Sequence, residues 1–363
     1  MDFLKKFNTE TQYDADVENL EYATVSYIED IEEVRYMKKY IPNYSEQYLT
    51  FEVLEDGTFT LNIPSDVDST YMTSVSYSTD NGETWTTTTV DNTEQTITTP
   101  TINAGDKVLW KGVGKQMSRS TSNNYFSCFS STGNFKVSGN IMSLLYGDEF
   151  ANQVVFPSNS TYNFYSLFTN NNRLISAENL ILPATTLASN CYNGMFNGCT
   201  SLTTAPVLPA TTLASNCYNG MFNGCTSLTT APSILPATTL ATACYYQMFY
   251  DCTSLTTAPE LPATTLATAC YNNMFYGCRL LTTAPYLPAT TLADYCYGSM
   301  FGGCSSLNYI KAMFTTTPSS TYADSWVAGV AATGTFVKNS AAEWDVTGTY
   351  GIPTGWTVQT ANA

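Results

Sequence analysis

Ten of the eleven cysteines stand in two regular columns. Their thiols are the reactive side chains that this chain contains in the largest regular set. The columns are Cys191, Cys217, Cys244, Cys270 and Cys296, and then Cys199, Cys225, Cys252, Cys278 and Cys304. Cysteines of one pair are eight residues apart, about 12 Å along a helix, whereas a disulfide needs Cα atoms within about 7 Å. The spacing predicts free, buried thiols, and the lack of CxxC pairs argues against bound metal.

Other residues that could do chemistry are sparse. The chain has no histidine, which excludes the usual histidine-based hydrolases and His-ligated metal sites. The acidic pair Asp80 and Glu83 falls in a predicted turn. The glycines and lysine of residues 112–115 lack the spacing of a phosphate-binding loop. We therefore expect no enzyme, no cofactor and no metal.

Composition limits the partners that the protein could have. Of 363 residues only 12% are charged, and 30 acidic against 14 basic side chains give a net charge of -16. This balance argues against nucleic acid and against an anionic membrane surface as a partner. No apolar run approaches the length of a membrane helix, and Met1–Phe7 lacks the apolar core of a secretion signal. A chain that is neither membrane-spanning nor exported is expected.

A repeat dominates the second half of the chain. The string LPATTLA begins at Leu182, Leu208, Leu235, Leu261 and Leu287, which defines repeats 1 to 5 of 26 or 27 residues. Apolar residues between Leu187 and Phe196 recur at helical spacing, and Gly198 follows as an expected C-cap. The β-branched stretch 201–205 predicts a short strand. One strand and one helix per repeat predict a β/α solenoid, with a degenerate first copy near 168–183.

The repeat resembles a known family. The pattern AxxCYxxMFxGCxSLTTAPxLP is similar to the BspA-type leucine-rich repeat, which occurs in surface proteins of Bacteroides-group bacteria and in virion proteins of their phages. The likeness covers roughly residues 168–314. It implies the leucine-rich-repeat fold and a non-enzymatic surface or virion role.

The N-terminal segment predicts an acidic amphipathic helix over 17–41, ended by Pro42. Its apolar stripe also fits a heptad series, so the helix could dock against a partner or sister subunit, or pack on its own chain. The candidate anchor residues are Val17, Leu20, Tyr27, Ile31, Val34 and Ile41.

From residue 46 to 138 alternating apolar residues and turn signals predict a small immunoglobulin-like β-sandwich. Within it, residues 78–85 match the SxDxGxTW Asp-box, a structural hairpin turn in sialidases. Asp80 should bond turn amides, Gly82 should supply a positive φ, and Trp85 should pack under the turn. A single box with few arginines argues against sialidase activity. Aromatic residues in 315–363 predict a C-terminal cap.

The predicted fold class is thus multidomain, with an N-terminal helix, an Ig-like β-sandwich, and a β/α leucine-rich-repeat solenoid with a C-terminal cap. The predicted domains are a helical anchor (1–45), the sandwich (46–138), the solenoid (139–314) and the cap (315–363).

Positions that vary between repeats are the candidate ligand-contact surface, because tyrosine and asparagine suit glycan or protein contact. Neutral drift on a solvated face would leave the same pattern. The candidates are Asn193, Asn197, Asn219, Asn223, Tyr246, Tyr250, Asn272, Tyr276 and Tyr286.

These features together predict a phage virion structural protein, a fibre or a capsid decoration, that presents its repeats to host-surface glycan or protein. Other virion proteins or sister subunits would bind through the N-terminal helix, with a homotrimer favoured over a dimer by analogy with fibres. A bacterial cell-surface adhesin is the alternative, and an intracellular protein-binding scaffold is a third reading.

Overall fold

The computed structural model describes residues 20–21, 39–40, 46–91, 93–118 and 128–362. The chain divides into two compact units, residues 1–44 and 45–363. In the first unit, strand β1 (Leu20–Glu21) pairs antiparallel with β2 (Lys39–Tyr40).

This pairing overturns the predicted N-terminal helix. Leu20 lies opposite Tyr40, so the chain reverses direction between them, which one continuous helix over 17–41 cannot do. Leu20 is therefore a strand residue. The other candidate anchor residues, Val17, Tyr27, Ile31, Val34 and Ile41, lie outside the described residues.

The second unit begins with two β-sheets. The six-stranded sheet, in the order β11-β10-β3-β8-β5-β6, consists of β3 (Leu49–Val53), β5 (Met72–Ser78), β6 (Thr86–Thr89), β8 (Lys107–Gly114), β10 (Phe135–Asn140) and β11 (Leu174–Ile181). The three-stranded sheet, in the order β7-β4-β9, consists of β4 (Phe59–Ile63), β7 (Gln95–Thr98) and β9 (Cys128–Ser131). Side chains alternate between buried and partly exposed along β4, as a strand with one buried face requires.

Aromatic side chains from both sheets fill the core between them. The Phe51 ring of β3 lies 5.6 Å from the Phe59 ring of β4 and 4.9 Å from the Phe129 ring of β9. Trp110 of β8 also meets Phe129 edge-on at 4.9 Å. This core continues into the repeats, because Phe129 stacks on Phe168 at 5.5 Å.

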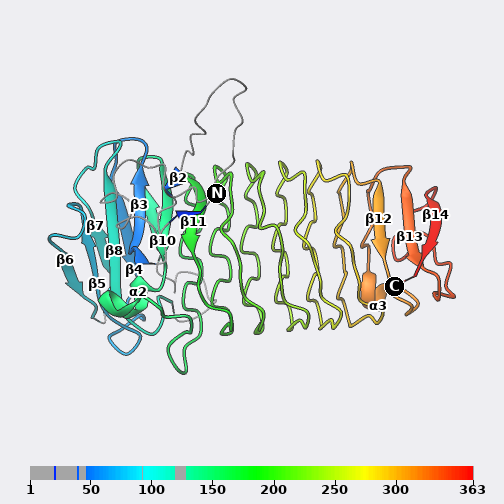
Figure 1. Ribbon diagram of the computed structural model, residues 1–363, viewed down its shortest axis with the longest axis horizontal. Coiled ribbons are helices and arrows are strands. Elements are labelled where there is room, and N and C mark those ends of the chain that lie inside the picture. The colour runs from blue at the N-terminus through cyan, green and yellow to red at the C-terminus, as the bar shows by residue number, and fades with distance from the viewer. Residues whose placement is uncertain (1–19, 22–38, 41–45, 92, 119–127, 363) are drawn as a thin grey trace, which may run out of the picture. The chain divides into compact units, whose positions relative to one another are not determined.

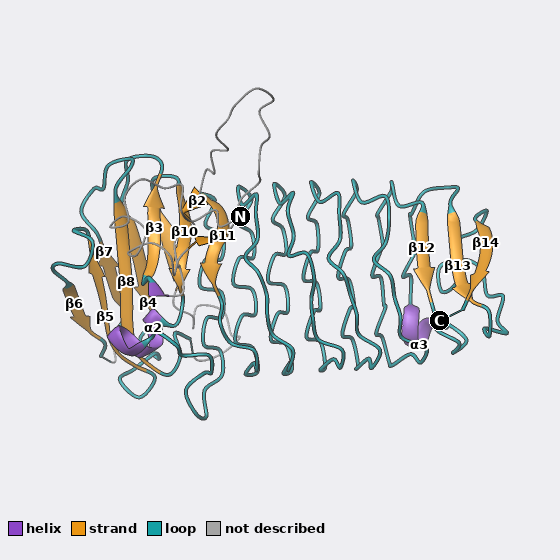
Figure 2. Cartoon of the chain, in the orientation of Figure 1, coloured by secondary structure: helices purple, strands orange, loops and turns teal. Residues whose placement is uncertain are grey.

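Helix is scarce in the described residues. It is limited to α2 (Ser143–Tyr146), the single 3-10 turn η4 (Gly147–Glu149) and α3 (Ser320–Ala323). A parallel sheet of β12 (Tyr309–Ala312), β13 (Thr335–Asn339) and β14 (Thr357–Ala361) follows the last repeat. Between β11 and β12 the repeats are drawn as loops and turns that lie side by side (Figure 1, Figure 2).

Each repeat is a chain of tight turns in place of the predicted helix. Asn190, Gly194 and Gly198 all have positive φ, at 57°, 62° and 71°, and a right-handed helix cannot pass through residues in that region. Met195 N donates to Tyr192 O to close one turn at 3.2 Å. The amides between such turns bond the next repeat instead, as Gly194 N does to Asn219 O at 2.8 Å.

The predicted strand is reduced to single bridges. Thr204 forms a parallel bridge with Ser176 on one side and with Thr230 on the other, but no ladder extends from it. Pro206 and Pro209 follow directly and have no amide hydrogen to continue a ladder.

The predicted fold class is therefore wrong. The described chain is mostly β and turn, with small sheets and stacked turns, and it is neither a β/α solenoid nor an all-antiparallel immunoglobulin-like sandwich. The sheet that begins in the predicted sandwich takes in β11, which lies beyond residue 138 and pairs parallel with β10. The domain boundaries at 138 and 314 stay predictions.

Candidate ligand-binding surface

The interior of the repeats is built from the same side chains at every level. Phe168, Phe196, Phe222, Phe249, Phe275 and Phe301 form one column with ring centroids 5.5 to 5.8 Å apart. Tyr192, Tyr218, Tyr245, Tyr271 and Tyr297 form a second, at 5.6 to 6.0 Å. Met195, Met221, Met248, Met274 and Met300 are fully buried. Burial of each large apolar side chain contributes about 1.5–3 kcal/mol.

The cysteine columns belong to this interior. All ten are buried free thiols. The thiol of Cys225 donates to Phe196 O of the preceding repeat at 3.1 Å, and Cys252 makes the same bond to Phe222 O. Burial raises the pKa of both thiols well above its usual value, so neither is a nucleophile at neutral pH. Cys128 stands apart and is partly exposed, and burial raises its pKa to about 11.

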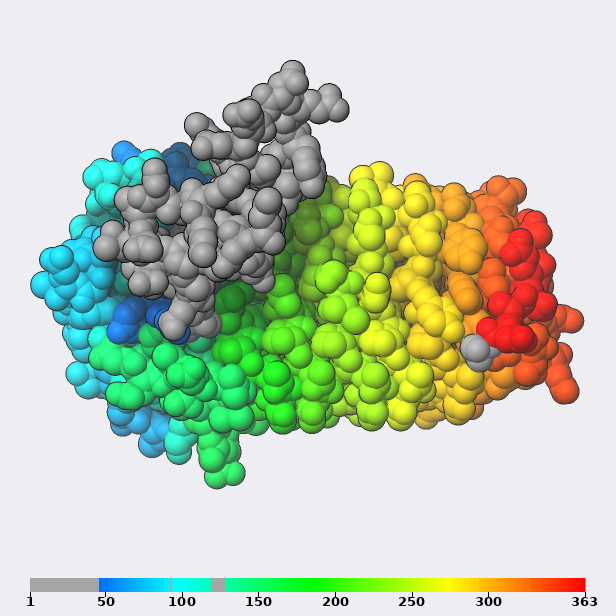
Figure 3. Space-filling model, in the orientation of Figure 1, coloured from blue at the N-terminus to red at the C-terminus, as the bar shows by residue number. Residues whose placement is uncertain are grey.

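The variable positions come to the outside of the turns in two rows. The first row is Asn193, Asn219, Tyr246, Asn272 and Gly298, and the second is Asn197, Asn223, Tyr250, Tyr276 and Gly302. The asparagines and tyrosines of both rows are partly or largely exposed. Successive repeats lie next to one another in the space-filling view (Figure 3).

Tyr250 and Tyr276 form a stacked pair in the second row. Their ring centroids are 4.8 Å apart with an interplanar angle of 7°. A Cβ on Gly302 would lie 2.7 Å from the Tyr276 ring, so the ring rests against this glycine. Partial burial raises the pKa of Tyr250, and the Asp251 carboxylate and the Tyr276 and Tyr246 hydroxyls act in the same direction. The Tyr250 phenol is therefore a neutral hydrogen-bond donor at physiological pH.

Amide side chains link neighbouring levels of the two rows. Asn223 Nδ2 donates to Gln247 Oε1 at 3.5 Å, and Asn272 Nδ2 donates to Tyr295 O at 3.4 Å. Asn193 and Asn219 instead bond Asn190 and Asn216 within their own turns. The structure thus connects repeats 2 to 5 across this surface.

Tyr286 does not join this surface. It belongs to the segment after the repeat's proline, is 43% exposed, and lies under Lys311 Nζ at 4.7 Å from its ring centroid. Two residues that sequence reasoning missed do belong to the surface. Gln247 bonds Asn223, and Asp251 lies against Gly277, where a Cβ would overlap its carboxylate. Both stand where repeats 1 and 2 have glycine, and this difference in sequence could have identified them as surface residues.

The Asp-box turn between β5 and β6 has the predicted structural roles. Asp80 accepts hydrogen bonds from the Thr84 amide at 2.9 Å and from the Ser78 hydroxyl at 2.7 Å. Gly82 has a φ of +91°, and Trp85 Nε1 donates to its carbonyl at 3.1 Å. The hydrogen bonds to the Asp80 carboxylate lower its pKa to about 2, and the bond from the Thr84 hydroxyl contributes most, followed by those from the Thr84 amide and the Ser78 hydroxyl.

A polar and aromatic cluster holds this turn to the sheet. Lys111 Nζ lies 4.0 Å from the Trp85 ring centroid and 2.7 Å from Asp148 Oδ1. Tyr48 donates its hydroxyl to the same carboxylate at 2.8 Å. Burial and this bond to Asp148 raise the pKa of Tyr48 to about 12. Every charged group of the cluster is paired within it, which indicates a structural role.

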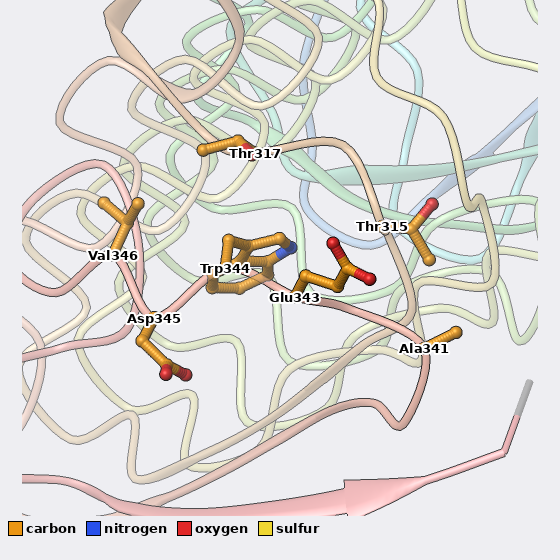
Figure 4. A pocket seen from close by; sticks show the side chains of 7 residues that line it. All are labelled: Thr315, Thr317, Ala341, Glu343, Trp344, Asp345 and Val346. Atoms are coloured by element: carbon orange, nitrogen blue, oxygen red, sulfur yellow. The ribbon is translucent and has the colours of Figure 1, made fainter.

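A shallow hollow of about 620 Å³ lies beside the C-terminal sheet (Figure 4). Trp344 stands at its centre, with the Glu343 and Asp345 carboxylates on either side of the ring. Lys338 Nζ, largely buried, already pairs with Asp345 Oδ1 at 2.6 Å and with Trp344 O at 2.7 Å. The carboxylates do not converge, and none of the predicted contact residues lines the hollow.

Within the part of the chain that the structure describes, no group of three or more potential ligand side chains could hold a metal ion. No helix of the described residues is long and apolar enough to cross a bilayer. Comparisons of the chain with protein-family models, with curated proteins and with solved structures gave no match.

Proposed function

We propose that this chain is a non-enzymatic structural protein of a phage virion, a head or tail fibre or a capsid decoration, that presents its repeats to a host-surface glycan or protein. The observation that supports this proposal is the contrast between the two sides of each turn. The interior cysteine, methionine and phenylalanine columns are the same in every repeat, whereas the exposed rows change from asparagine to tyrosine to glycine. A constant interior with a variable exterior suits a display scaffold.

Attachment to the particle is assigned to the compact unit of residues 1–44, which is separate from the unit that carries the repeats. Its partners would be other virion proteins or sister subunits. A bacterial cell-surface adhesin of the BspA type is the alternative, because the repeat motif is common to both settings.

Fractionation of a culture that expresses the protein separates the two functions. Purified particles and the cell envelope are each analysed by mass spectrometry for peptides of this chain. Enrichment with capsid and tail proteins through a density gradient is the expected result. Enrichment in the envelope fraction would favour the adhesin, and recovery only among unassembled soluble proteins would contradict both.

A further inference from the structure

The repeats are not equivalent in what they expose. Residues 182–206 and 208–232 are identical in sequence, so repeats 1 and 2 present the same asparagines twice. Repeat 3 departs from them at six positions, which are Thr242, Ala243, Tyr246, Gln247, Tyr250 and Asp251. Repeat 4 keeps the second tyrosine of this set as Tyr276. Repeats 4 and 5 depart at further positions, among them Arg279 and Leu280 of repeat 4, so the differences begin at repeat 3.

The two tyrosines of the second row lie together in space. Tyr250 and Tyr276 stack at 4.8 Å, and Tyr276 lies against Gly302 of repeat 5. Tyr276 thus has one ring face against Tyr250 and the other against Gly302, which leaves its edge and hydroxyl for a ligand. Within the described residues neither hydroxyl makes a hydrogen bond, and Tyr276 is 36% exposed.

The groups beside the pair are polar. Asn223 and Gln247 lie on the repeat 2 side, Asp251 follows Tyr250, and Asn272 occupies the first row of repeat 4. A protein partner is usually held by an aromatic or arginine anchor that is fully desolvated, whereas Tyr250 and Tyr276 pack on each other and have polar neighbours. Phenol, amide and carboxylate groups instead match the many hydroxyls of a saccharide.

We propose that the outward face of repeats 3 and 4, centred on Tyr250 and Tyr276 with Asp251 beside them, is a binding site for a neutral, hydroxyl-rich glycan. A neutral ligand is favoured because the Asp251 carboxylate and the net charge of -16 both repel an anionic one. The site rests on the proposed function, since it specifies which ligand the displayed repeats would hold.

The test uses the full-length chain on a printed array of neutral glucans, mannans and galactans beside sialylated and sulfated oligosaccharides. The double variant Tyr250→Asn/Tyr276→Asn places at both positions the residue that repeats 1 and 2 carry. The control is Thr256→Ala, at an exposed position of repeat 3 that belongs to neither row. A second pair, Tyr250→Phe/Tyr276→Phe, keeps the rings and removes the hydroxyls.

Binding to a neutral oligosaccharide is expected for the wild type and for the control. The asparagine variant should lose about tenfold or more in affinity with an unchanged melting temperature, and the phenylalanine variant should lose less. Retention of binding by the asparagine variant would overturn the site. Binding to acidic oligosaccharides alone, or to none, would overturn the ligand class, as would binding that survives periodate oxidation of the array.

These outcomes are separable from the proposed function, because the particle fractionation does not depend on any glycan. A chain that is found in virions yet fails on the array retains its structural role and loses this site. A chain that binds the array but is absent from particles has the site without the virion role.

Discussion

At the scale of single residues, the Asp-box turn is the best-defined polar feature. Asp80, Gly82 and Trp85 could be assigned from sequence because their bonds are local and stay within eight residues. The partners that fix this turn could not, since Lys111 and Asp148 are distant in sequence and meet only when β8 and η4 pack together. Local chemistry was thus predictable, whereas its tertiary support was not.

The lowered pKa of Asp80 makes one residue-scale prediction about pH. A carboxylate with a folded pKa of about 2, against an ordinary value of 3.8, stabilises the fold at pH values above 3.8. That contribution is lost as the pH falls toward 2. The free energy of unfolding of the wild type should therefore decrease more between these values than that of Asp80→Asn. Chemical denaturation at stepped pH measures both, and parallel curves for the two proteins would contradict the assignment.

At the scale of the element, the repeat length and the buried residues followed from the sequence, but the conformation did not. Cys191, Met195 and Cys199 recur every four residues, a spacing shared by a helix face and by this chain of four-residue turns. Glycine at 194 and 198 hinted at left-handed backbone. Repeat 3 gave no such hint, because Gln247 and Asp251 adopt positive φ at the positions equivalent to Gly194 and Gly198.

Tyr250 and Tyr276 illustrate how far the candidate site could be predicted. Their variability singled them out in sequence, and a stack in register brings them together. Tyr286 was grouped with them on residue type alone, yet it lies in the segment that follows the proline and contacts Lys311. Side-chain type therefore identified candidates, and only the path of the turns decided which of them share a surface.

The buried methionine column makes an element-scale prediction. Met248 is fully buried in repeat 3, the middle of the five, so Met248→Ala should cost about 2–5 kcal/mol of unfolding free energy. Met248→Asp should cost more, because its carboxylate would be buried without a partner. Thr256→Asp adds the same charge at an exposed position of the same repeat, and should change stability by about 0.5 kcal/mol or less.

Denaturant titrations of these three variants and the wild type supply the comparison. A denaturant titration curve for Met248→Asp that matches the wild-type curve would show that the methionine column does not face the interior. A large loss for Thr256→Asp would show that charge itself, and not burial, disrupts the stack.

At the scale of the whole molecule, the division into two compact units makes a prediction about assembly. Residues 45–363 share one continuous core from the sheets through the repeats, so deletion of 1–44 should leave their melting transition intact. If residues 1–44 attach the chain to sister subunits, light scattering should give an oligomer for the full-length chain and a monomer for the truncated one. Oligomers of equal size for both chains would show that the contact between subunits lies outside residues 1–44. Monomers for both chains would show that the protein does not self-associate.

The central claim is that this protein displays its repeats for host attachment. The most direct test is whether purified chain competes with intact particles for binding to host cells. Excess full-length wild-type chain should reduce particle adsorption, because both would occupy the same surface ligand. The Tyr250→Asn/Tyr276→Asn chain at equal concentration should leave adsorption unchanged, while the Thr256→Ala chain should compete like the wild type. Adsorption that is unaffected by any of the three chains would contradict the role in attachment, and equal competition by all three would contradict the tyrosine site.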